Sequence, residues 1–302
     1  MNILITGGTG FVGSQLVSLL KEKQGHKLFV ITRNPNKYKS AETDHLKYIS
    51  LDQEGLLSDE IVKDIHIIIN LAGENIANSR WSDAQKERLK ESRSTRTNML
   101  LAQFKDSEKL KKIISASAIG IYPVNLETEL DEGSNLGEGF LPELCKEWEK
   151  SVTDFNHSCK KAILRIGVVF GKGGGALDKL WPIFKFGLGG KIGNGKQMMS
   201  WIHISDLVGA IDFLVDNIEI NGEFNATSPE PVSNQRFTKA LGKAFNMPAI
   251  FPVPPFMLKL AMGEMSTIVL DGQTIIPKKL LAAGYQFKFA QVENALEDVV
   301  NS

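Results

Sequence analysis

Cysteine is scarce in this chain. Only Cys145 and Cys159 occur among 302 residues, so the sequence carries neither a disulfide framework nor the cysteine spacing of a zinc site. The five histidines are scattered, with no His-Glu-x-x-His motif and no His–Cys cluster. We therefore expect no metal site.

The net charge of the chain is zero. Lys+Arg and Asp+Glu both number 35, which gives no electrostatic reason to expect nucleic acid or an anionic membrane as a partner. No charged leader precedes the first apolar residues, and no run of about 18 apolar residues occurs anywhere in the chain. These absences predict a cytoplasmic protein.

Strand-length apolar runs alternate with stretches of helical periodicity. This alternation predicts an α/β fold, a Rossmann-type doubly wound parallel sheet with helices on both faces. Ser82 opens a capping box for a helix that reaches about residue 104, and Ser205 is the expected N-cap of a later helix. The predicted strands cover 2–6, 27–32, 65–73, 111–118 and 162–171.

The character of the sequence changes after residue 171. Glycines accumulate over about 171–200, which is typical of loops over a substrate site, although a flexible linker has the same composition. Prolines become frequent from 229 onward. We predict a cofactor-binding domain over 1–228 that contains the glycine-rich insertion, and a small C-terminal capping region over 229–302.

A phosphate-binding turn follows the first strand. Gly7, Gly10 and Gly13 form a Gly-x-x-Gly-x-x-Gly pattern between that strand and a helix over 11–23. The first glycine permits the tight turn, the second lets the backbone approach a pyrophosphate, and the third lets helix and strand pack closely. The helix N-terminus would present free N–H groups to the phosphates. The alternative is a glycine turn required only for packing.

The end of the second predicted strand selects the cofactor. An acidic residue there would hold the ribose 2′-hydroxyl of NAD, whereas an arginine accommodates a 2′-phosphate. The strand ends at Thr32 and Arg33, and no Asp or Glu lies between Lys23 and Ala41. A guanidinium makes paired hydrogen bonds to a phosphate. NADP(H) is therefore the predicted cofactor; the alternative for Arg33 is a solvated charge.

Several motifs resemble those of one family. Thr-Gly-Gly-Thr-Gly-Phe-Val-Gly, the Ser-Ala-Ser-Ala strand and Trp-Ile-His-Ile-Ser-Asp occur in the order found in extended short-chain dehydrogenases/reductases. More narrowly, the chain resembles their atypical, epimerase-like branch, family 39U, with a C-terminal region of the DUF1731 type. The narrower resemblance rests on the segments 70–76, 115–122, 144–149, 173–177, 187–197 and 275–287.

The resemblance implies roles for individual residues. The turn would cradle the pyrophosphate, the end of the second strand would meet the 2′-phosphate, and the next strand end would flank the adenine. Glu74 and Arg80 would face the substrate pocket, with a surface ion pair as the alternative. The implied cofactor-binding residues are Gly7, Thr9, Gly10, Phe11, Val12, Gly13, Thr32, Arg33, Leu51, Asp52, Leu71, Ala72, Gly73, Glu74, Arg80 and Val168.

The catalytic pair of that superfamily is absent. Its members use a tyrosine as proton donor, with a lysine four residues later that lowers the tyrosine pKa. The four tyrosines of this chain are followed at that spacing by Glu42, Asp52, Leu126 and Phe289, so no Tyr-x-x-x-Lys exists. Alignment on Glu149 places Leu141 and Cys145 at the two positions.

Other residues are then candidates for the chemistry. Ser117 fits the serine that orients the substrate oxygen in the family. Tyr122 is the best substitute for the missing tyrosine, with a rim aromatic packed on the cofactor as the alternative, and Glu74 is a candidate base. Cys145 is a weaker candidate, because a buried cysteine is usually inert. Gln197, Trp201 and His203 would either line the pocket or fix a strand–helix junction.

Two functional hypotheses follow. The first is an NADP(H)-dependent oxidoreductase or nucleotide-sugar-epimerase-like enzyme on a small, polar substrate held between the glycine-rich loops and the C-terminal region. The second is an NADP(H)-binding sensor or regulatory protein that kept the cofactor site and lost the chemistry. The missing Tyr–Lys pair favours the second, whereas Ser117 and the loops favour the first. A homodimer is left open.

Overall fold

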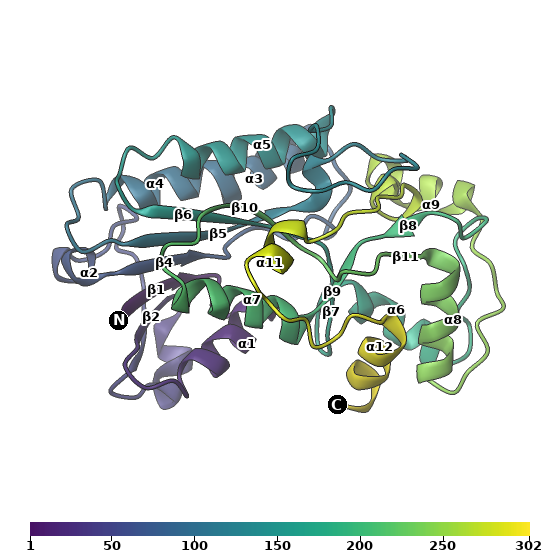
Figure 1. The fold of residues 1–302 in the computed structure, drawn as a ribbon, viewed down its shortest axis with the longest axis horizontal. Coiled ribbons are helices and arrows are strands. Elements are labelled where there is room, and N and C mark those ends of the chain that lie inside the picture. Colours follow the sequence, from purple (N-terminus) through teal and green to yellow (C-terminus); the bar gives the residue numbers. More distant parts are fainter.

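A parallel sheet of seven strands forms the centre of the larger lobe in the computed structural model, which describes residues 1–302 (Figure 1). The strand order is β10-β6-β5-β4-β1-β2-β3, and every neighbouring pair is parallel. The predicted parallel sheet is therefore confirmed, but the strand predicted over 162–171 is divided at Gly167, and its second part pairs with residues 201–203 outside this sheet. The strands are β1 (Asn2–Thr6), β2 (Lys27–Ile31), β3 (Leu46–Ile49), β4 (Ile67–Asn70), β5 (Lys112–Ala118), β6 (Lys160–Ile166) and β10 (Gly222–Ala226).

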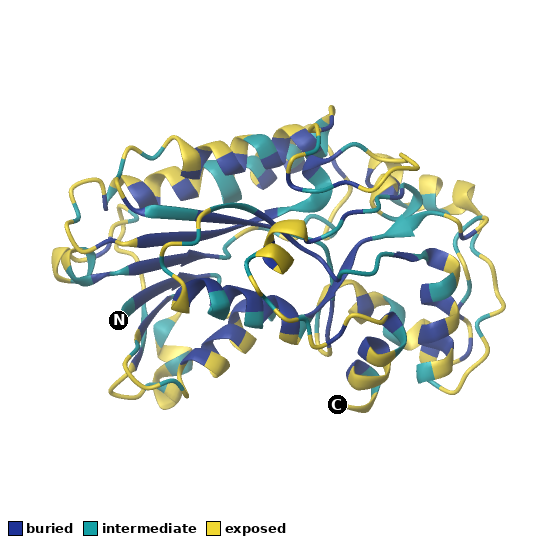
Figure 2. Cartoon of the chain, viewed as in Figure 1, coloured by how far each residue is buried: buried dark blue, intermediate teal, exposed yellow.

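The central strands are apolar because helices cover both faces. On one face α1 (Phe11–Leu20) packs beside α7 (Ile204–Asp216). The other face carries α2 (Asp59–Asp64), α3 (Asp83–Lys90), a π turn over Glu91–Thr95, α4 (Arg96–Ala102) and α5 (Phe140–Thr153). Figure 2 shows the buried residues concentrated between these layers. This pattern explains the unbroken apolar runs of the strands.

The strand order reverses beside β1. Its neighbours are β2 on one side and β4 on the other, so the connections from β1 and from β3 run in opposite directions across the sheet. Open α/β sheets bind ligands at such a switch point, outside the carboxyl ends of the strands. The predicted phosphate turn follows β1 at this place.

A second lobe lies beside the sheet and is formed by segments from before and after residue 228. Its core joins Phe170 and Trp201 to Phe237, Leu241 and residues of the last helix. No helix in the chain is both long and apolar enough to span a bilayer. The lobe and its surroundings comprise β7 (Val168–Phe170), α6 (Gly175–Lys185), β8 (Met198–Met199), β9 (Trp201–His203), β11 (Val232–Ser233), α8 (Asn234–Ala244), α9 (Pro255–Met262), α10 (Thr267–Leu270), α11 (Lys278–Ala282) and α12 (Val292–Asn301).

One predicted helix cap is confirmed and one is wrong. Ser82 is the N-cap of α3, where its side chain accepts a hydrogen bond from the Gln85 backbone N–H at 3.3 Å. Ser205 lies inside α7, and the N-cap is His203, whose ring Nδ1 accepts from the Ser205 backbone N–H at 3.2 Å. A histidine ring can replace a cap hydroxyl because its unprotonated nitrogen is a hydrogen-bond acceptor.

Candidate functional site

The turn after β1 has no space for side chains at two of its glycines. Gly7 has a φ of 68°, and a Cβ there would lie 2.7 Å from the Leu71 carbonyl carbon. A Cβ on Gly13 would lie 2.2 Å from the Gly7 carbonyl oxygen. The N-cap of α1 is Gly10, and no side chain caps this helix. The helix N-terminus can therefore offer its N–H groups to an anion.

The glycine-rich segment after β7 packs on this turn. The ring of Phe11, in the first turn of α1, lies so close that a Cβ on Gly174 would be 2.5 Å from it. A Cβ on Gly171 would also be 2.8 Å from the same ring. The start of the 171–200 segment is thus packed against Phe11 beside the phosphate turn, and the alternative of a flexible linker does not describe it.

The end of β2 presents an unpartnered cation. Arg33 is exposed and makes no hydrogen bond or ion pair, and Thr32 beside it is half-buried. The carboxylate of Asp52 is committed to its own loop, where Oδ1 accepts from the backbone N–H groups of Glu54 at 2.9 Å and Leu56 at 2.8 Å. Leu51 is 38 % exposed beside it. A free guanidinium at this strand end fits a phosphate.

The segment after β4 is held from several sides. The backbone N–H of Ala72 donates to Thr6 Oγ1 at 3.2 Å, and the carbonyl of Glu74 accepts from Arg93 at 2.7 Å. The Glu74 carboxylate accepts from Gln85 Nε2 at 2.8 Å, which leaves its second oxygen free. This arrangement fixes the segment Leu71–Glu74 beside the turn.

Arg80 and Glu74 do not pair. The Arg80 guanidinium donates to the carbonyl oxygens of Ala261 at 2.8 Å and Leu260 at 2.7 Å, at the carboxyl end of α9. Neither residue forms a salt bridge, so the alternative interpretation as a surface ion pair is wrong. Arg80 instead ties the loop after β4 to the C-terminal region.

A buried polar network lies at the carboxyl ends of β5 and β6. Ser117 Oγ donates to Glu149 Oε1 at 2.7 Å. Arg165 binds the same carboxylate through Nε and Nη2, both at 2.8 Å, and donates from Nη1 to the Tyr122 hydroxyl at 2.8 Å. That hydroxyl donates to Asn225 Oδ1 at 2.8 Å. The network joins α5, β5, β6 and β10.

Burial and charge act against each other in this network. Burial alone would lower the pKa of Arg165, but the hydrogen bonds and charge of Glu149 raise it above its ordinary value. Burial raises the pKa of Tyr122 despite the nearby guanidinium. Since the Tyr122 side chain is fully buried and both functions of its hydroxyl are used, it is neither a rim aromatic nor an available proton donor.

The positions of the missing Tyr–Lys pair belong to a packing helix. Leu144, Trp148 and Val152 of α5 are buried at a spacing of four residues, so they form an apolar face that packs on the core. Cys145 is also buried, and burial raises the pKa of its thiol to about 12. The thiolate, which is the nucleophile, is therefore not formed near neutral pH, and Cys145 is not a nucleophile candidate.

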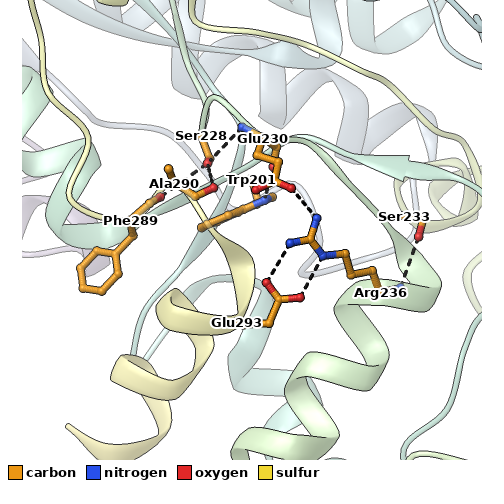
Figure 3. A network of polar contacts seen from close by, with 8 residues as sticks. All are labelled: Trp201, Ser228, Glu230, Ser233, Arg236, Phe289, Ala290 and Glu293. Atoms are coloured by element: carbon orange, nitrogen blue, oxygen red, sulfur yellow. Dashed lines mark hydrogen bonds and ion pairs between the residues drawn. The ribbon is translucent and has the colours of Figure 1, made fainter.

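The segment that begins at Trp201 fixes a junction rather than lining a pocket. Trp201 is fully buried and its indole N–H donates to the Glu230 carbonyl at 2.9 Å, within the network drawn in Figure 3. The carboxylate of Asp206 accepts from the backbone N–H groups of Lys288 at 2.7 Å and Phe289 at 2.9 Å. Gln197 donates to backbone carbonyls of neighbouring loops.

Sequence reasoning missed the Glu149–Arg165 pair. The family resemblance drew attention to Val168, which is half-buried at the start of β7, and not to Arg165 three residues before it. The position of Arg165 inside an apolar strand indicates a buried ion pair, because a buried charge requires a partner. Helical periodicity alone does not show which helix residue supplies it.

A parallel sheet that reverses beside β1, with a glycine turn at the reversal, defines a Rossmann-type α/β protein. The chain belongs to the NAD dependent epimerase/dehydratase family, whose model matches residues 3–227. A second model, the domain of unknown function DUF1731, matches residues 253–299. The predicted family resemblance is confirmed.

Similar proteins cover the whole chain. The epimerase family protein YfhF of Bacillus subtilis is 36 % identical over 304 residues, which cover 99 % of this chain and 98 % of YfhF. The human epimerase family protein SDR39U1, solved with NADPH, matches with a TM-score of 0.89 and 31 % identity over 100 % of both chains. A UDP-glucuronic acid 4-epimerase of Bacillus cereus, solved with NAD, has a TM-score of 0.81 at 19 % identity over 100 % of this chain and 98 % of that chain, which is a likeness of fold.

Proposed function

We propose that the chain binds NADP(H). The residues fit this group: α1 begins at Gly10 without a side-chain cap, which leaves the N–H groups of its first turn available to a pyrophosphate, and Arg33 is an exposed guanidinium without a partner. The segment between Lys23 and Ala41 contains no Asp or Glu, so no carboxylate there repels a 2′-phosphate. The human relative solved with NADPH supports the same choice. Thr9 to Val12 would hold the pyrophosphate, and Thr32 would assist Arg33.

We propose further that the protein is an oxidoreductase or epimerase-like enzyme in which Ser117 and Glu149 handle the proton. The observation that carries this proposal is the 2.7 Å hydrogen bond from Ser117 Oγ to Glu149 Oε1 at the carboxyl end of β5. The single proton of the Ser117 hydroxyl is committed to Glu149, so this hydroxyl can accept a hydrogen bond from a substrate alcohol but cannot donate one.

The direction of the hydrogen bond between Ser117 and Glu149 defines the proposed proton path. When an alcohol is oxidised, its proton passes to Ser117 Oγ, and the serine proton passes to Glu149 Oε1. The reverse movement returns a proton to a carbonyl oxygen that gains a hydride. A bound nicotinamide would supply the hydride acceptor or donor. Arg165 holds the Glu149 carboxylate in place and favours its ionised form, so Glu149 carries the proton only during the transfer. Glu74, with one free carboxylate oxygen, is the second candidate base.

A second candidate function is a binding protein that senses NADP(H) without turnover. The observation in its favour is burial: Ser117 is 2 % exposed and Glu149 8 % exposed. A substrate would reach Ser117 only if the residues above it moved. A sensor requires no such movement, because the phosphate turn and Arg33 lie at the surface.

Two measurements test these proposals. NADPH and NADH binding is followed by fluorescence titration of the full chain and of Arg33→Ala, with Lys105→Ala as a control at another exposed, unpaired cation. Loss of two charge-assisted hydrogen bonds should weaken NADPH binding roughly 10- to 100-fold and leave NADH unchanged. An equal loss for both cofactors would contradict the 2′-phosphate assignment.

Turnover is then followed as NADPH oxidation across a panel of carbonyl substrates, and as epimerisation of nucleotide sugars, which consumes no net cofactor. With an active substrate, Ser117→Ala should lower kcat roughly 10²- to 10⁴-fold while NADPH binding stays the same. Tight NADPH binding without turnover on any member of the panel would favour the sensor. Turnover unaffected by Ser117→Ala would refute the proton path.

A further inference from the structure

Helix α9 (Pro255–Met262) is apolar but contributes no buried residue to the fold. Phe256 is 68 % exposed, Met257 52 % and Leu260 78 %. The positions 256, 257 and 260 share one side of a helix, so their side chains form a single apolar face. An exposed apolar face of this kind marks an interaction site more often than an isolated surface leucine does.

A second exposed apolar segment lies beside the approach to α9. The backbone N–H of Phe251 donates to the Gly189 carbonyl at 3.1 Å, and that of Val253 donates to the Lys191 carbonyl at 2.9 Å. Phe186 is 73 % exposed, Leu188 60 % and Ile250 71 %. These hydrogen bonds bring residues 183–191 and 247–260 together into one surface, which we call the apolar tip.

The apolar tip lies at one end of the molecule. In Figure 1, α8 and α9 occupy the end opposite the N-terminus, and Figure 2 shows α9 and the outer loops of this end as largely exposed, whereas α8 carries buried residues. Side chains that are 60–78 % exposed project from the surface. They therefore suit a soft or planar partner better than a ligand enclosed in a cleft.

The segments that form the apolar tip carry charges of one sign. The segments 179–200 and 235–263 contain no Asp or Glu. Lys185, Lys191, Lys196 and Lys259 are exposed, and none of them forms a salt bridge. The one arginine of these segments, Arg236, is occupied by Glu230 and Glu293 in the network of Figure 3. The zero net charge of the whole chain thus conceals a cationic end.

This distribution of charge decides between possible occupants. A second copy of the chain in a symmetric dimer would place the same lysines against one another, because a two-fold interface joins a patch to itself. An anionic bilayer surface accepts both features, since apolar side chains enter the boundary between headgroups and acyl chains while lysines approach the lipid phosphates.

We propose that the apolar tip docks on an anionic lipid bilayer. Phe256, Met257, Leu260 and the neighbouring exposed side chains insert at the surface, and the unpaired lysines bind the headgroups. This inference does not depend on the proposed enzymatic function. It replaces the expectation of no membrane partner, which rested on whole-chain net charge.

Vesicle sedimentation with the full-length protein tests the proposal. The protein should sediment with vesicles of phosphatidylcholine and phosphatidylglycerol, should not sediment with phosphatidylcholine alone, and should be released as salt rises. Lys191→Ala and Lys259→Ala should each weaken partitioning about fivefold. Phe256→Ser combined with Leu260→Ser should abolish it. All variants should keep the wild-type melting temperature and NADPH binding, because these side chains are exposed.

Two controls are matched to the variants. Met99→Ser removes an apolar side chain that is 51 % exposed on α4, and Lys105→Ala removes an exposed, unpaired lysine beyond that helix. Neither should alter sedimentation. Absence of binding to anionic vesicles would overturn the proposal, as would binding that the tip variants leave unchanged. A dimer in light scattering that the double variant dissociates would identify a second copy as the occupant instead.

Discussion

Glu149→Gln replaces one oxygen of a buried carboxylate by an amide NH₂ group. In the native structure that carboxylate accepts two hydrogen bonds from Arg165 and one from Ser117, and Glu149 and Arg165 are 8 % and 5 % exposed. The amide NH₂ group would either face the Arg165 guanidinium, donor against donor, or replace one of the oxygens that accept its hydrogen bonds. The positive charge of Arg165 would also have no counterion. Breaking a buried ion pair in this way costs about 3–5 kcal/mol.

The assay is thermal unfolding, together with denaturant titration to give the free energy of unfolding. With an unfolding entropy of about 2.1 cal/mol/K per residue, the loss corresponds to a fall in Tm of about 5–8 °C for a chain of 302 residues. Asp154→Asn is the control: Asp154 ends the same helix and pairs with Lys150 at 3.9 Å, but the two side chains are 63 % and 73 % exposed. Its effect should stay below about 0.5 kcal/mol.

A further variant separates ion-pair energy from packing. Glu149→Leu combined with Arg165→Met removes both charges, so no charge remains buried alone, and part of the stability should return relative to Glu149→Gln. Equal Tm values for Glu149→Gln and Asp154→Asn would refute the reasoning, because the buried network would then contribute no more than a solvated pair.

Three other predictions concern the turn, a buried lysine and the cysteines. Gly13→Ala, whose Cβ would lie 2.2 Å from the Gly7 carbonyl oxygen, should lower the unfolding free energy by about 1–3 kcal/mol or more and abolish NADPH binding, whereas Gly10→Ala, at 3.2 Å, should destabilise less in thermal unfolding. Lys112 is fully buried, and burial lowers its pKa from 10.5 to about 8. Between these two pH values the unfolded chain therefore binds more protons than the folded chain. As pH rises from about 8 to about 10.5, the free energy of unfolding of the wild type should increase relative to that of Lys112→Met by up to about 3 kcal/mol. A difference that does not change with pH in denaturant titrations would contradict the assignment. Burial raises the pKa of Cys145 to about 12 and that of Cys159 to about 11, so a thiol reagent should label Cys145, which is enclosed in α5, more slowly than Cys159, which borders a surface hollow.

The sequence predicted the sheet and the phosphate turn because both depend on local patterns. An unbroken apolar strand followed by Gly-x-x-Gly-x-x-Gly allows few structures, since Gly7 and Gly13 leave no space for a Cβ. The N-cap of α7 was less predictable. A serine is the usual cap, but the ring of His203, two residues earlier, takes that place.

The roles assigned to single polar residues depended on contacts that the sequence does not show. Tyr122 follows a strand end, which is where sites form, but its hydroxyl meets Asn225 from a strand 103 residues later and is removed from solvent. Arg80 was placed toward the substrate, whereas the structure directs it to α9, 180 residues away.

By itself, the sequence determined the class of fold, the glycine turn after β1, the arginine at the end of β2 and the absence of a Tyr–Lys pair, because each is a matter of residue type at a fixed short spacing. Only the tertiary structure decided that Ser117 donates to Glu149, that Arg165 neutralises that carboxylate and that exposed apolar side chains gather among lysines at one end. The physical reason is that a hydrogen bond or a charged surface is defined by distance in space. The residues that form these contacts are far apart in the sequence and come together only when the chain is folded.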